Sequence, residues 1–595
     1  MGGTKIHCPD FHPKISAIFP PKQAFAAFFS LNVRFLSQAV AEAVPLCQIK
    51  TAKCMKHFLS YFEEVTLSKW DRPALSDYKG TDYSYAQVAA ELKTLHIAYQ
   101  RLGVQPGDKI AFCGQNSARW AMAFLATATY HAVTVPILYD FTPDAVQRLT
   151  DHSESVVLFT DERMFSHLNP LASTHLKAVV SLKDYTCLWA REPRFAHAFT
   201  EAGAEFCRLF PDGLTSSDVH YEGTMDELAI INYTSGTTGN PKGVMLTGRS
   251  LSANVNYALE NIRVTSEDSS LSMLPMAHMF GLTFEFLYPL CGGSHVYFLG
   301  KTPSPSTLMA AFADVKPYIL ITVPLVMEKI IKGKILPVLD KPAMRVLTRI
   351  PGISHVLYRV MRGKLMEAFG GKVREIPMGG AALNPTVEDV LRRLKMPYAV
   401  GYGMTECGPL ISYKAWKEFR PGTCGESLGR YNEVRIASPD PERIVGEVQV
   451  RGDVVMQGYY KNEEATRAAF TEDGWLKTGD LGLIDSRGSI ALKGRSKCMI
   501  LSSNGQNIYP EEIEAVANSL PEVGESLVVS RDGKIVALVA LADGAGTVSA
   551  DALRMRINSA LPGYSRLSGL ELMKEAFVHT PKHSIKRSLY TDLNA

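Results

Sequence analysis

The chain has 595 residues, which exceeds one typical domain, so two or more domains are expected. Its hydrophobic content of 46% and charged content of 21% are those of an ordinary globular protein, and a net charge of +3 argues against nucleic-acid binding. No apolar run is long enough to predict a membrane span, and the ten scattered cysteines without a CxxC pair favour a reducing cytoplasm over a disulfide framework.

Residues 1–54 differ in composition from the rest of the chain. They hold six Lys or Arg residues but only two acidic ones, Asp10 and Glu42. Gln23–Val44 is mostly apolar, but basic residues interrupt the region and no cleavage site follows it, so a signal peptide is not expected. We treat this segment as a leader. It is an acid-poor presequence, a surface helix that touches a membrane or, as we favour, an upstream extension of a chain that starts at Met55.

From about residue 80 onward, helix-like and strand-like patterns alternate. Such alternation is typical of α/β layers built on largely parallel sheets. The first predicted elements are a helix that follows Tyr83–Ala86, a strand at Asp108–Phe112, a helix at Trp120–Tyr130 and a strand at Thr134–Leu138.

A polar loop lies between two predicted core strands, Leu228–Ile231 and Val244–Leu246. Its eleven residues, Tyr233–Gly243, include four Ser or Thr hydroxyls, three glycines and one lysine. Glycine lets backbone N–H groups approach an anion closely, hydroxyls add donors, and Lys242 adds a mobile positive charge. The loop is therefore predicted to bind a polyphosphate. It is not a Walker A loop, because Gly243 and strand-like residues follow the lysine.

Two shorter motifs follow. In Gly401–Glu406, Tyr402 is suited to stacking on a base, Thr405 to binding phosphate and Glu406 to holding Mg²⁺. In Trp475–Asp480, an aspartate is expected after a tight turn, where its carboxylate can accept both ribose hydroxyls. Each motif alone is equally typical of an ordinary surface turn.

The region after Gly494 predicts a small α+β unit. Pro510 and acidic residues open a helix, Glu525–Ser530 and Lys534–Leu541 form a hairpin, and Ser549 caps a helix that runs to Leu561. Asp532-Gly533 is a strong turn dipeptide for that hairpin.

These motifs, in this order, resemble those of the adenylate-forming, AMP-binding superfamily, and most of all the bacterial long-chain fatty acid–CoA ligases. The resemblance runs from about residue 60 to 590. It implies an α/β fold with a large N-terminal domain of layered α/β subdomains and a small C-terminal α+β domain. We therefore predict a large adenylation domain at 55–496 and a small mobile domain at 497–595.

The resemblance also implies roles for individual residues. Nucleotide binding falls to Thr234, Ser235, Gly236, Thr237, Thr238, Gly239, Lys242, Gly380, Ala381, Tyr402, Gly403, Thr405, Asp480 and Arg495. Catalytic roles fall to Thr234, Lys242, His278, Glu406 and Lys497. Among these, His278 lies near the carboxylate pocket, Glu406 holds the metal and Lys497 is the pivot between the domains. The alternative for His278 is a core histidine with a satisfied hydrogen bond.

One position departs from the family pattern. Aligned on Thr580-Pro581 and Lys586-Arg587, Ser584 stands where long-chain members carry a catalytic lysine. Lys582 and Lys586 lie two residues to either side, so a shift of register would restore a lysine. Otherwise adenylation is impaired, because that lysine stabilises charge that develops during attack on the α-phosphate.

The predicted activity is that of a fatty acid–CoA ligase that forms AMP. ATP activates a fatty acid to acyl-AMP, CoA accepts the acyl group, Mg²⁺ is the cofactor and the small domain rotates between the two reactions. No nucleic acid partner is expected, and a cytoplasmic protein in peripheral contact with a membrane is compatible with the sequence. Two alternatives stay open: an acyl-AMP ligase that loads a carrier protein, and a non-enzymatic protein that binds a nucleotide or acyl-AMP.

Overall fold

The computed structural model describes residues 54–234, 241–300, 304–501, 507–531, 533–542, 544–546, 548–579 and 585–591. Contacts along the chain separate Met1–Met55 from Lys56–Ala595, and the fold described below belongs to the second unit. All but the last residue of the predicted leader lies outside the described residues. No helix within the described ranges is long and apolar enough to cross a membrane.

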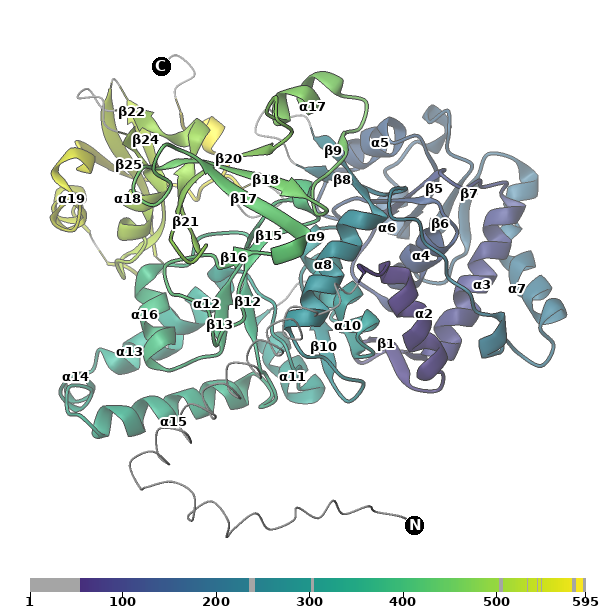
Figure 1. Ribbon diagram of the computed structural model, residues 1–595, viewed down its shortest axis with the longest axis horizontal. Helices are drawn as coiled ribbons and strands as arrows, with labels where there is room; N and C mark the ends of the chain where they lie inside the picture. The colour runs from purple at the N-terminus through teal and green to yellow at the C-terminus, as the bar shows by residue number, and fades with distance from the viewer. Residues whose placement is uncertain are drawn as a thin grey trace, which may run out of the picture. The chain divides into compact units, whose positions relative to one another are not determined.

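An eight-stranded sheet occupies the first half of the described chain (Figure 1). Its inner strands β3, β4, β5, β6 and β8 run parallel, whereas β7, β9 and β19 join antiparallel at the edges. In spatial order the strands are β19 Gly458–Tyr459, β9 Lys242–Thr247, β8 Leu228–Thr234, β4 Val133–Pro136, β3 Lys109–Cys113, β5 Ser155–Thr160, β6 Ala178–Ser181 and β7 Cys187–Ala190.

The helices that alternate with these strands confirm the predicted α/β class. They are α3 Tyr85–Arg101, α4 Ala118–Thr129, α5 Pro143–His152, α6 Glu162–Phe165 and α7 Ala198–Leu209. Ser84 caps α3 through a reciprocal pair of hydrogen bonds with Gln87, which explains why the helix starts directly after the predicted Tyr83–Ala86 signal. β5 is buried at all six positions, as expected for a strand covered on both faces.

A second, four-stranded sheet has the order β10-β11-β1-β2. Its elements are β1 Pro73–Asp77, β2 Asp82–Ser84, β10 Ser269–Ser272 and β11 His295–Phe298, with helices α2 Phe58–Ser68, α8 Gly248–Asn261, α9 Met279–Gly281 and α10 Tyr288–Cys291 nearby in the chain. Helix α8 is buried along most of its length, including its amide and hydroxyl side chains. Asn256 and Ser252 use these groups to bind the backbone of Lys56 and Phe58, so α8 anchors the start of the described chain.

The middle of the chain forms a helical layer around a short parallel pair of strands, β12 Ile376–Met378 and β13 Tyr398–Val400. The helices are α11 Pro305–Val315, α12 Pro324–Ile330, α13 Leu336–Leu339, α14 Pro342–Leu347, α15 Ile353–Ala368 and α16 Pro385–Arg393. Their apolar faces meet in one core that includes Phe312, Met327, Leu365 and Val387.

Two antiparallel sheets follow, so the expectation of largely parallel sheets holds only for the first half of the fold. Strands that need only short turns between them pair antiparallel, and no crossover helix is required. One sheet has β14 Tyr402–Gly403, β15 Leu410–Tyr413 and β16 Glu426–Ser427; the other has β17 Asn432–Ala437, β18 Gly446–Gly452, β20 Leu476–Ile484 and β21 Ile490–Arg495, with helix α17 Glu463–Ala469 inserted before β20.

The C-terminal region has a core of its own, built from Ile513, Val528, Ala537, Leu553 and other apolar residues. Its elements are β22 Ile500–Leu501, β23 Asn507–Ile508, α18 Pro510–Ala517, β24 Val523–Arg531, β25 Lys534–Leu541, α19 Ala550–Ser559 and β26 Gly569–Leu572. The predicted hairpin is confirmed, because β24 and β25 pair antiparallel up to Arg531 and Lys534. Ser549 caps α19 as predicted. The domain boundary near Lys497 stays a prediction.

Candidate functional site

The predicted phosphate loop is the end of a hairpin. Strands β8 and β9 pair as far as Thr234 and Lys242, so these two residues lie in the ladder and not in the loop, which corrects the predicted loop bounds. Pairing continues that far because the buried Tyr233 packs on Gly243, where an added Cβ would lie 2.9 Å from Ile231. The predicted ligands Ser235, Gly236, Thr237, Thr238 and Gly239 lie outside the described residues.

The Gly401–Glu406 motif forms a tight loop beside this hairpin. Gly403 has no room for a side chain, because an added Cβ would overlap the carbonyl oxygen of Pro409. Asn254 of α8 fixes the loop, since its amide nitrogen donates to the Cys407 carbonyl at 3.2 Å and its oxygen accepts the Leu410 N–H at 2.9 Å. The loop therefore presents its predicted ligands from a rigid base.

Tyr459 of β19 connects this loop to the hairpin. Its hydroxyl donates to Glu406 Oε1 at 2.9 Å, and its ring centroid lies 4.6 Å from Nζ of Lys242, within cation–π range. Burial raises the pKa of Tyr459 above its ordinary value, and the Glu406 carboxylate raises it further, so the phenol keeps its proton and acts as the donor. One side chain thus joins the predicted metal ligand to the predicted phosphate-binding lysine.

The carboxylate of Asp480 is held by two predicted nucleotide ligands. Tyr402 donates its hydroxyl to Oδ2 at 2.7 Å, and Arg495 pairs with Oδ1 at 3.1 Å. Asp480 does not follow a tight turn as predicted but lies within β20, opposite Arg495 of β21. The preceding residue, Gly479, has a φ of +73°, and the strand pairing is irregular there, so the sequence looks like a turn although the ladder continues.

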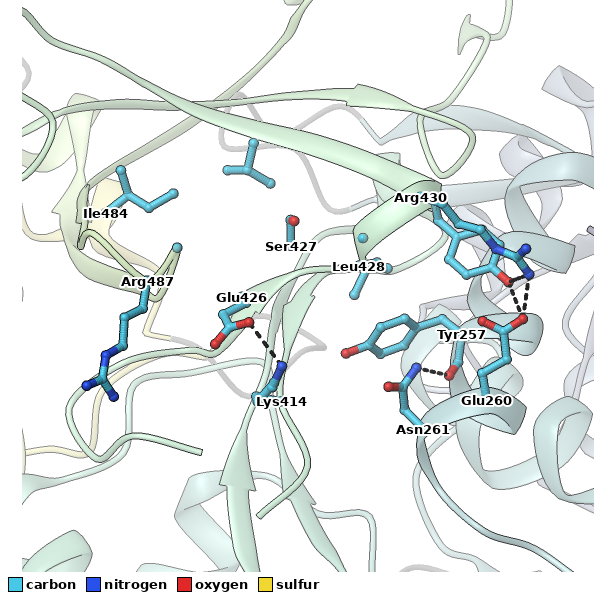
Figure 2. A pocket seen from close by; sticks show the side chains of 14 residues that line it. Tyr257, Glu260, Asn261, Lys414, Glu426, Ser427, Leu428, Arg430, Ile484 and Arg487 are labelled. Carbon is cyan, nitrogen blue, oxygen red and sulfur yellow. Dashed lines mark hydrogen bonds and ion pairs between the residues drawn. The ribbon is translucent and has the colours of Figure 1, made fainter. Parts of the chain in front are cut away.

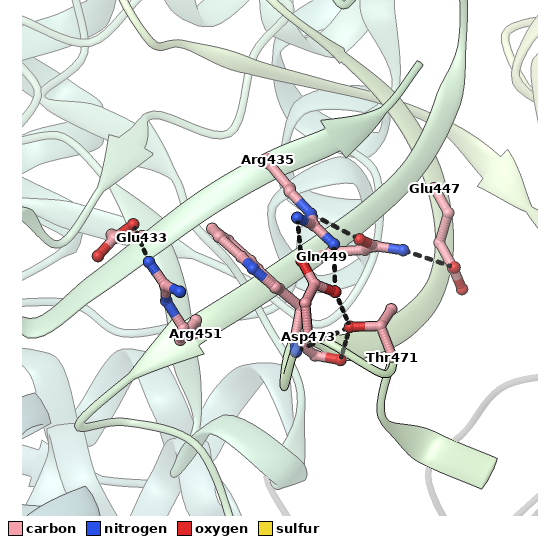
Figure 3. A network of polar contacts seen from close by, with 8 residues as sticks. Glu433, Arg435, Glu447, Gln449, Arg451, Thr471 and Asp473 are labelled. Atoms are coloured by element: carbon pink, nitrogen blue, oxygen red, sulfur yellow. Dashed lines mark hydrogen bonds and ion pairs between the residues drawn. The ribbon is translucent and has the colours of Figure 1, made fainter. Parts of the chain in front are cut away.

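A network of polar side chains on β17, β18 and the segment before β20 supports β20 (Figure 3). Arg435 donates to Asp473 at 2.7 Å and to Gln449 at 2.8 Å, and Gln449 continues to Glu447. Glu447 in turn accepts the N–H of Gly479 at 3.1 Å. The network therefore ends on the backbone of Gly479, next to Asp480, and helps to fix the position of that carboxylate.

The segment that carries His278 lies against the same structures. Asn232 of β8 donates to the Ala277 carbonyl at 2.8 Å, and an added Cβ at Gly379 would lie 3.3 Å from Phe280 and 3.6 Å from the carbonyl oxygen of Gly401. Partly buried His278 thus adjoins the hairpin and the turn at Gly379. The predicted Gly380 and Ala381 are exposed in that turn, and Gly380 has a φ of +86°.

A buried carboxylate clamps the loop before His278. Glu285, which is fully buried in a π-helical turn, accepts the N–H groups of Met273 and Leu274 at 2.9 and 2.8 Å. Burial raises the pKa of Glu285 well above its ordinary value. Asn116 holds the same loop from the other side by accepting the Met276 N–H at 2.9 Å.

The fifth predicted catalytic residue, Lys497, stands apart from these contacts. It is exposed in the short turn Ser496–Cys498 that connects β21 to β22. Ser584, which occupies the position of the family lysine, lies outside the described residues. The structure thus forms two sets of contacts, one that joins Lys242 and Glu406 through Tyr459 and one that joins Tyr402 and Arg495 to Asp480. Lys497 stands outside both sets.

Glu406 fits the requirements of a magnesium ligand. Mg²⁺ keeps most of its water and binds proteins through one or two carboxylates together with substrate phosphates. Glu406 is 8% exposed and commits Oε1 to Tyr459. Across the described ranges no cluster of three or more His, Cys, Asp or Glu side chains is suited to hold a metal ion on its own. A single carboxylate joined through Tyr459 to Lys242, the predicted phosphate-binding lysine, agrees with this mode of binding.

A cavity of about 410 Å³ lies elsewhere, next to β16 and the end of α8 (Figure 2). Lys414 and Glu426 form an ion pair on its wall at 3.0 Å, and Arg430 and Tyr431 both contact Glu260. None of the predicted site residues lines this cavity. Most of the charges on its wall pair with each other, so it does not replace the site described above.

Two contributors to the site were not found by reading the sequence. Tyr459 belongs to a Gly-Tyr-Tyr run that has no recognisable pattern, and it reaches Glu406 only because β19 joins the edge of the large sheet. Asn254 is one of several polar residues on α8, and nothing in its spacing indicates that it binds a loop 150 residues later.

Comparisons with known proteins agree with this arrangement. The family model for AMP-binding enzymes matches residues 62–460. A long-chain-fatty-acid–CoA ligase of Mycobacterium bovis is 30% identical over 477 residues, which are 76% of this chain and 76% of that protein. The 4-coumarate–CoA ligase 3 of Oryza sativa is 27% identical over 548 residues, which are 88% of this chain and 89% of that protein.

Solved structures share the fold. The o-succinylbenzoate CoA synthetase of Bacillus subtilis, in complex with its acyl-adenylate intermediate, has a TM-score of 0.71 at 22% identity, over 90% of this chain and 98% of that chain. The same enzyme with ATP and a magnesium ion has a TM-score of 0.68 over 89% and 98% of the two chains. The match of the family model shows that the chain belongs to the AMP-binding enzyme family. The relatives named above are acyl- and aryl-CoA ligases.

Proposed function

We propose that this protein is a fatty acid–CoA ligase that forms AMP and acts on long-chain fatty acids. The observation that carries the proposal is a pair of contact sets, one from Lys242 through Tyr459 to Glu406 and one from Tyr402 to Asp480 and Arg495. Tyr402 and Glu406 are four residues apart on one loop. A nucleotide that reached Asp480 with its ribose would therefore have its phosphates near Glu406 and Lys242.

In the first reaction, a carboxylate oxygen of the fatty acid attacks the α-phosphorus of ATP, and the bond from that phosphorus to pyrophosphate breaks. Two anions must meet, so positive charge is needed on both sides of the reacting phosphate. Lys242 supplies part of this charge, and the hydroxyls of the predicted loop would donate hydrogen bonds to the phosphate oxygens. Magnesium bound at Glu406 would supply the rest by neutralising phosphate oxygens. Asp480 and Tyr402 orient the nucleoside, and His278 faces the incoming carboxylate.

In the second reaction, the thiol sulfur of CoA attacks the acyl carbon, the bond to AMP breaks and the thiol proton is lost to solvent. We propose that the region after Lys497 rotates between the two reactions, as separate conformations let one site serve both. The exposed turn Ser496–Cys498 is a suitable pivot. A rotation has to break the hydrogen bond that Lys332 Nζ donates to the Asn518 carbonyl at 2.7 Å. Lys332 lies just after α12, and Asn518 lies at the end of α18.

Lys497→Pro tests this rotation. We expect the variant to form acyl-AMP at the wild-type rate but to lose thioester formation, because proline removes freedom at the pivot and leaves the nucleotide site intact. Equal loss of both reactions would contradict the pivot.

The CoA assay separates the proposal from a carrier-loading ligase. Purified full-length protein is incubated with ATP, Mg²⁺, CoA and fatty acids of different length, and acyl-CoA is detected by mass spectrometry. Free acyl-CoA, strongest with long chains, is the expected product. Acyl-AMP that accumulates in the presence of CoA would favour a carrier protein as the acceptor instead.

The substitution at Ser584 favours a second candidate, a protein that binds ATP or acyl-AMP without turning it over. Such a protein would bind ATP but release no pyrophosphate. For either candidate we propose a cytoplasmic location with peripheral contact to a membrane, where long-chain fatty acids partition.

A further inference from the structure

Helices α14 and α15 and the segment between them carry a cluster of exposed aliphatic side chains. Five of the fifteen large hydrophobic residues that are exposed in the described chain lie between positions 346 and 360, and each is 40% to 62% exposed. We call them the α14–α15 stripe: Val346, Ile350, Ile353, Val356 and Val360. The last three recur at the spacing that places side chains on one face of a helix. Exposed apolar side chains that gather in this way mark interaction sites more often than single ones do.

The stripe is not the face through which α15 packs on the core of its own fold. Helix α15 already packs through Tyr358, Met361 and Leu365 against the core of the helical layer. Those residues and the stripe lie on different sides of the helix, because Ile353, Val356 and Val360 are offset from them by one or two positions. Figure 1 shows α14 and α15 at the edge of the helical layer, with α13 and α16 on one side only. The stripe is therefore presented outward by a helix that is held in place.

Basic residues surround the stripe. Between positions 341 and 366 the chain has six Lys or Arg residues and no Asp or Glu, although the whole chain has a net charge of only +3. The six are Lys341, Arg345, Arg349, Arg359, Arg362 and Lys364. Arg345 pairs with Asp340 at 3.2 Å, and Arg349, Arg359 and Lys364 are exposed. An aliphatic stripe beside a net positive charge is the pattern of a helix that lies in the interface of an anionic membrane.

We propose that α14 and α15 form a docking surface for an anionic lipid bilayer, with the α14–α15 stripe inserted among the acyl chains and the basic residues on the headgroups. Charge argues against two other occupants. Residues 1–54 have six basic and two acidic residues, so the leader would meet like charge. A second copy paired through the same surface would do so as well. The choice of a membrane over an acidic protein rests on the proposed fatty-acid substrate.

Vesicle cosedimentation of the full-length protein tests the proposal without any need for catalysis. The vesicles contain phosphatidylcholine alone or phosphatidylcholine with phosphatidylglycerol. We expect the wild type to bind the anionic vesicles, to bind neutral ones weakly, and to be released by salt. The double variant V356E/V360E should lose binding by about 100-fold, because each buried valine contributes about tenfold. R349E/R359E should lose about 25-fold or more, from about fivefold for each positive charge removed near the surface.

Leu171→Glu is the matched control. Leu171 is 74% exposed in the short turn Pro170–Ala172, far from the stripe in sequence, and the variant should bind vesicles like the wild type. Thermal unfolding confirms that each variant is folded. Wild-type binding by V356E/V360E would overturn the proposal, and so would equal binding of neutral and anionic vesicles.

Three further results distinguish failure of the docking surface from failure of the proposed function. If the wild type is a dimer that V356E/V360E dissociates, and neither binds vesicles, the stripe is an interface between copies. If the wild type binds no vesicles yet forms acyl-CoA, the docking surface fails while the proposed function stands. If vesicles are bound but no acyl-CoA or pyrophosphate is formed, the proposed function fails and the docking surface stands.

Discussion

The hydroxyl of Tyr459 donates a 2.9 Å hydrogen bond to Oε1 of Glu406. The face of the same ring lies 4.6 Å from Nζ of Lys242, so one tyrosine fixes both the predicted metal ligand and the predicted phosphate-binding lysine. Tyr459 is a positioning residue in this account, because it acts on the nucleotide through these two side chains.

Tyr459→Phe keeps the ring over Lys242 and removes the hydrogen bond to Glu406. We expect pyrophosphate release to fall about 10- to 100-fold, since a hydrogen bond to a charged group contributes about 1.5–3 kcal/mol. Tyr459→Leu should lower it further, because the cation–π contact is lost as well. Steady-state kinetics with varied Mg²⁺ and calorimetric binding of ATP measure the effect.

The next residue offers a matched control. Tyr460 donates its hydroxyl to Glu154 at 2.9 Å, away from Glu406, so Tyr460→Phe should leave both rate and ATP affinity near the wild-type values. Equal losses from the two Phe variants would assign the effect to the stability of β19 and not to the position of Glu406.

Gly403→Ala tests whether the loop around Glu406 has to be this tight. The added methyl group would overlap the backbone of Pro409, which cannot move as a flexible side chain can. We expect a lower melting temperature and a loss of ATP binding, with a cost of about 1–3 kcal/mol from overpacking. In contrast, Gly203 in α7 has no atom within 4 Å of an added Cβ, so Gly203→Ala should raise stability by about 0.5–1 kcal/mol. A Gly403→Ala variant that binds ATP normally would contradict the role of this loop.

Asp480→Ala should weaken ATP binding by about 10- to 100-fold, because it removes the acceptor proposed for the ribose and leaves Tyr402 and Arg495 without their shared partner. Isothermal calorimetry with ATP measures the change. Glu433→Gln is the control, since Glu433 of β17 forms an exposed ion pair with Arg451 of β18. If both variants bind ATP equally well, the proposed ribose site is wrong.

The sequence predicted the α/β class, the C-terminal hairpin and the cap of α19, because each depends on local patterns or turn residues. The predictions that Thr234 and Lys242 lie in a loop and that Asp480 follows a tight turn were wrong, because all three residues lie in strands. Glycines near them indicate turns, whereas cross-strand pairing, which depends on distant residues, extends the ladders. The predicted roles of these residues stay predictions, although the fold brings most of them together.

What the sequence could not supply is the contact between segments far apart. Asn254 binds the loop at Cys407, and Tyr459 binds Glu406, through surroundings that exist only in the folded chain. The α14–α15 stripe was missed for the opposite reason. In a sequence, apolar residues at helical spacing indicate a helix face that is buried in the core. Only the exposure of the stripe in the folded structure shows that this face is not buried.

Glu375 is expected to make stability depend on pH. Burial raises its pKa from 4.5 to about 7, while hydrogen bonds from the Trp416 N–H and the Tyr413 hydroxyl oppose the shift. The unfolded chain releases this proton near pH 4.5 but the folded chain keeps it, so the stabilisation is complete below pH 4.5 and is lost as the pH rises through about 7.

Glu375→Gln isolates this contribution, because the amide oxygen can still accept both hydrogen bonds but does not titrate. Between pH 5 and pH 8, we expect the free energy of unfolding of the wild type to fall by about 1–3 kcal/mol relative to that of the variant. The melting temperature of the wild type should fall with it. Parallel melting curves across that range would show that Glu375 does not carry the proton.

The central claim is that the contacts around Glu406 and Asp480 belong to a working adenylation site. It is tested most directly by fatty-acid-dependent release of pyrophosphate from ATP and Mg²⁺, across chain lengths, with the wild type, Ser584→Lys and Lys242→Ala. The account predicts release by the wild type only when a fatty acid is present, strongest with long chains, and loss in Lys242→Ala. A silent wild type would contradict it; rescue by Ser584→Lys would then trace the loss to position 584, and silence from both would favour a binding protein.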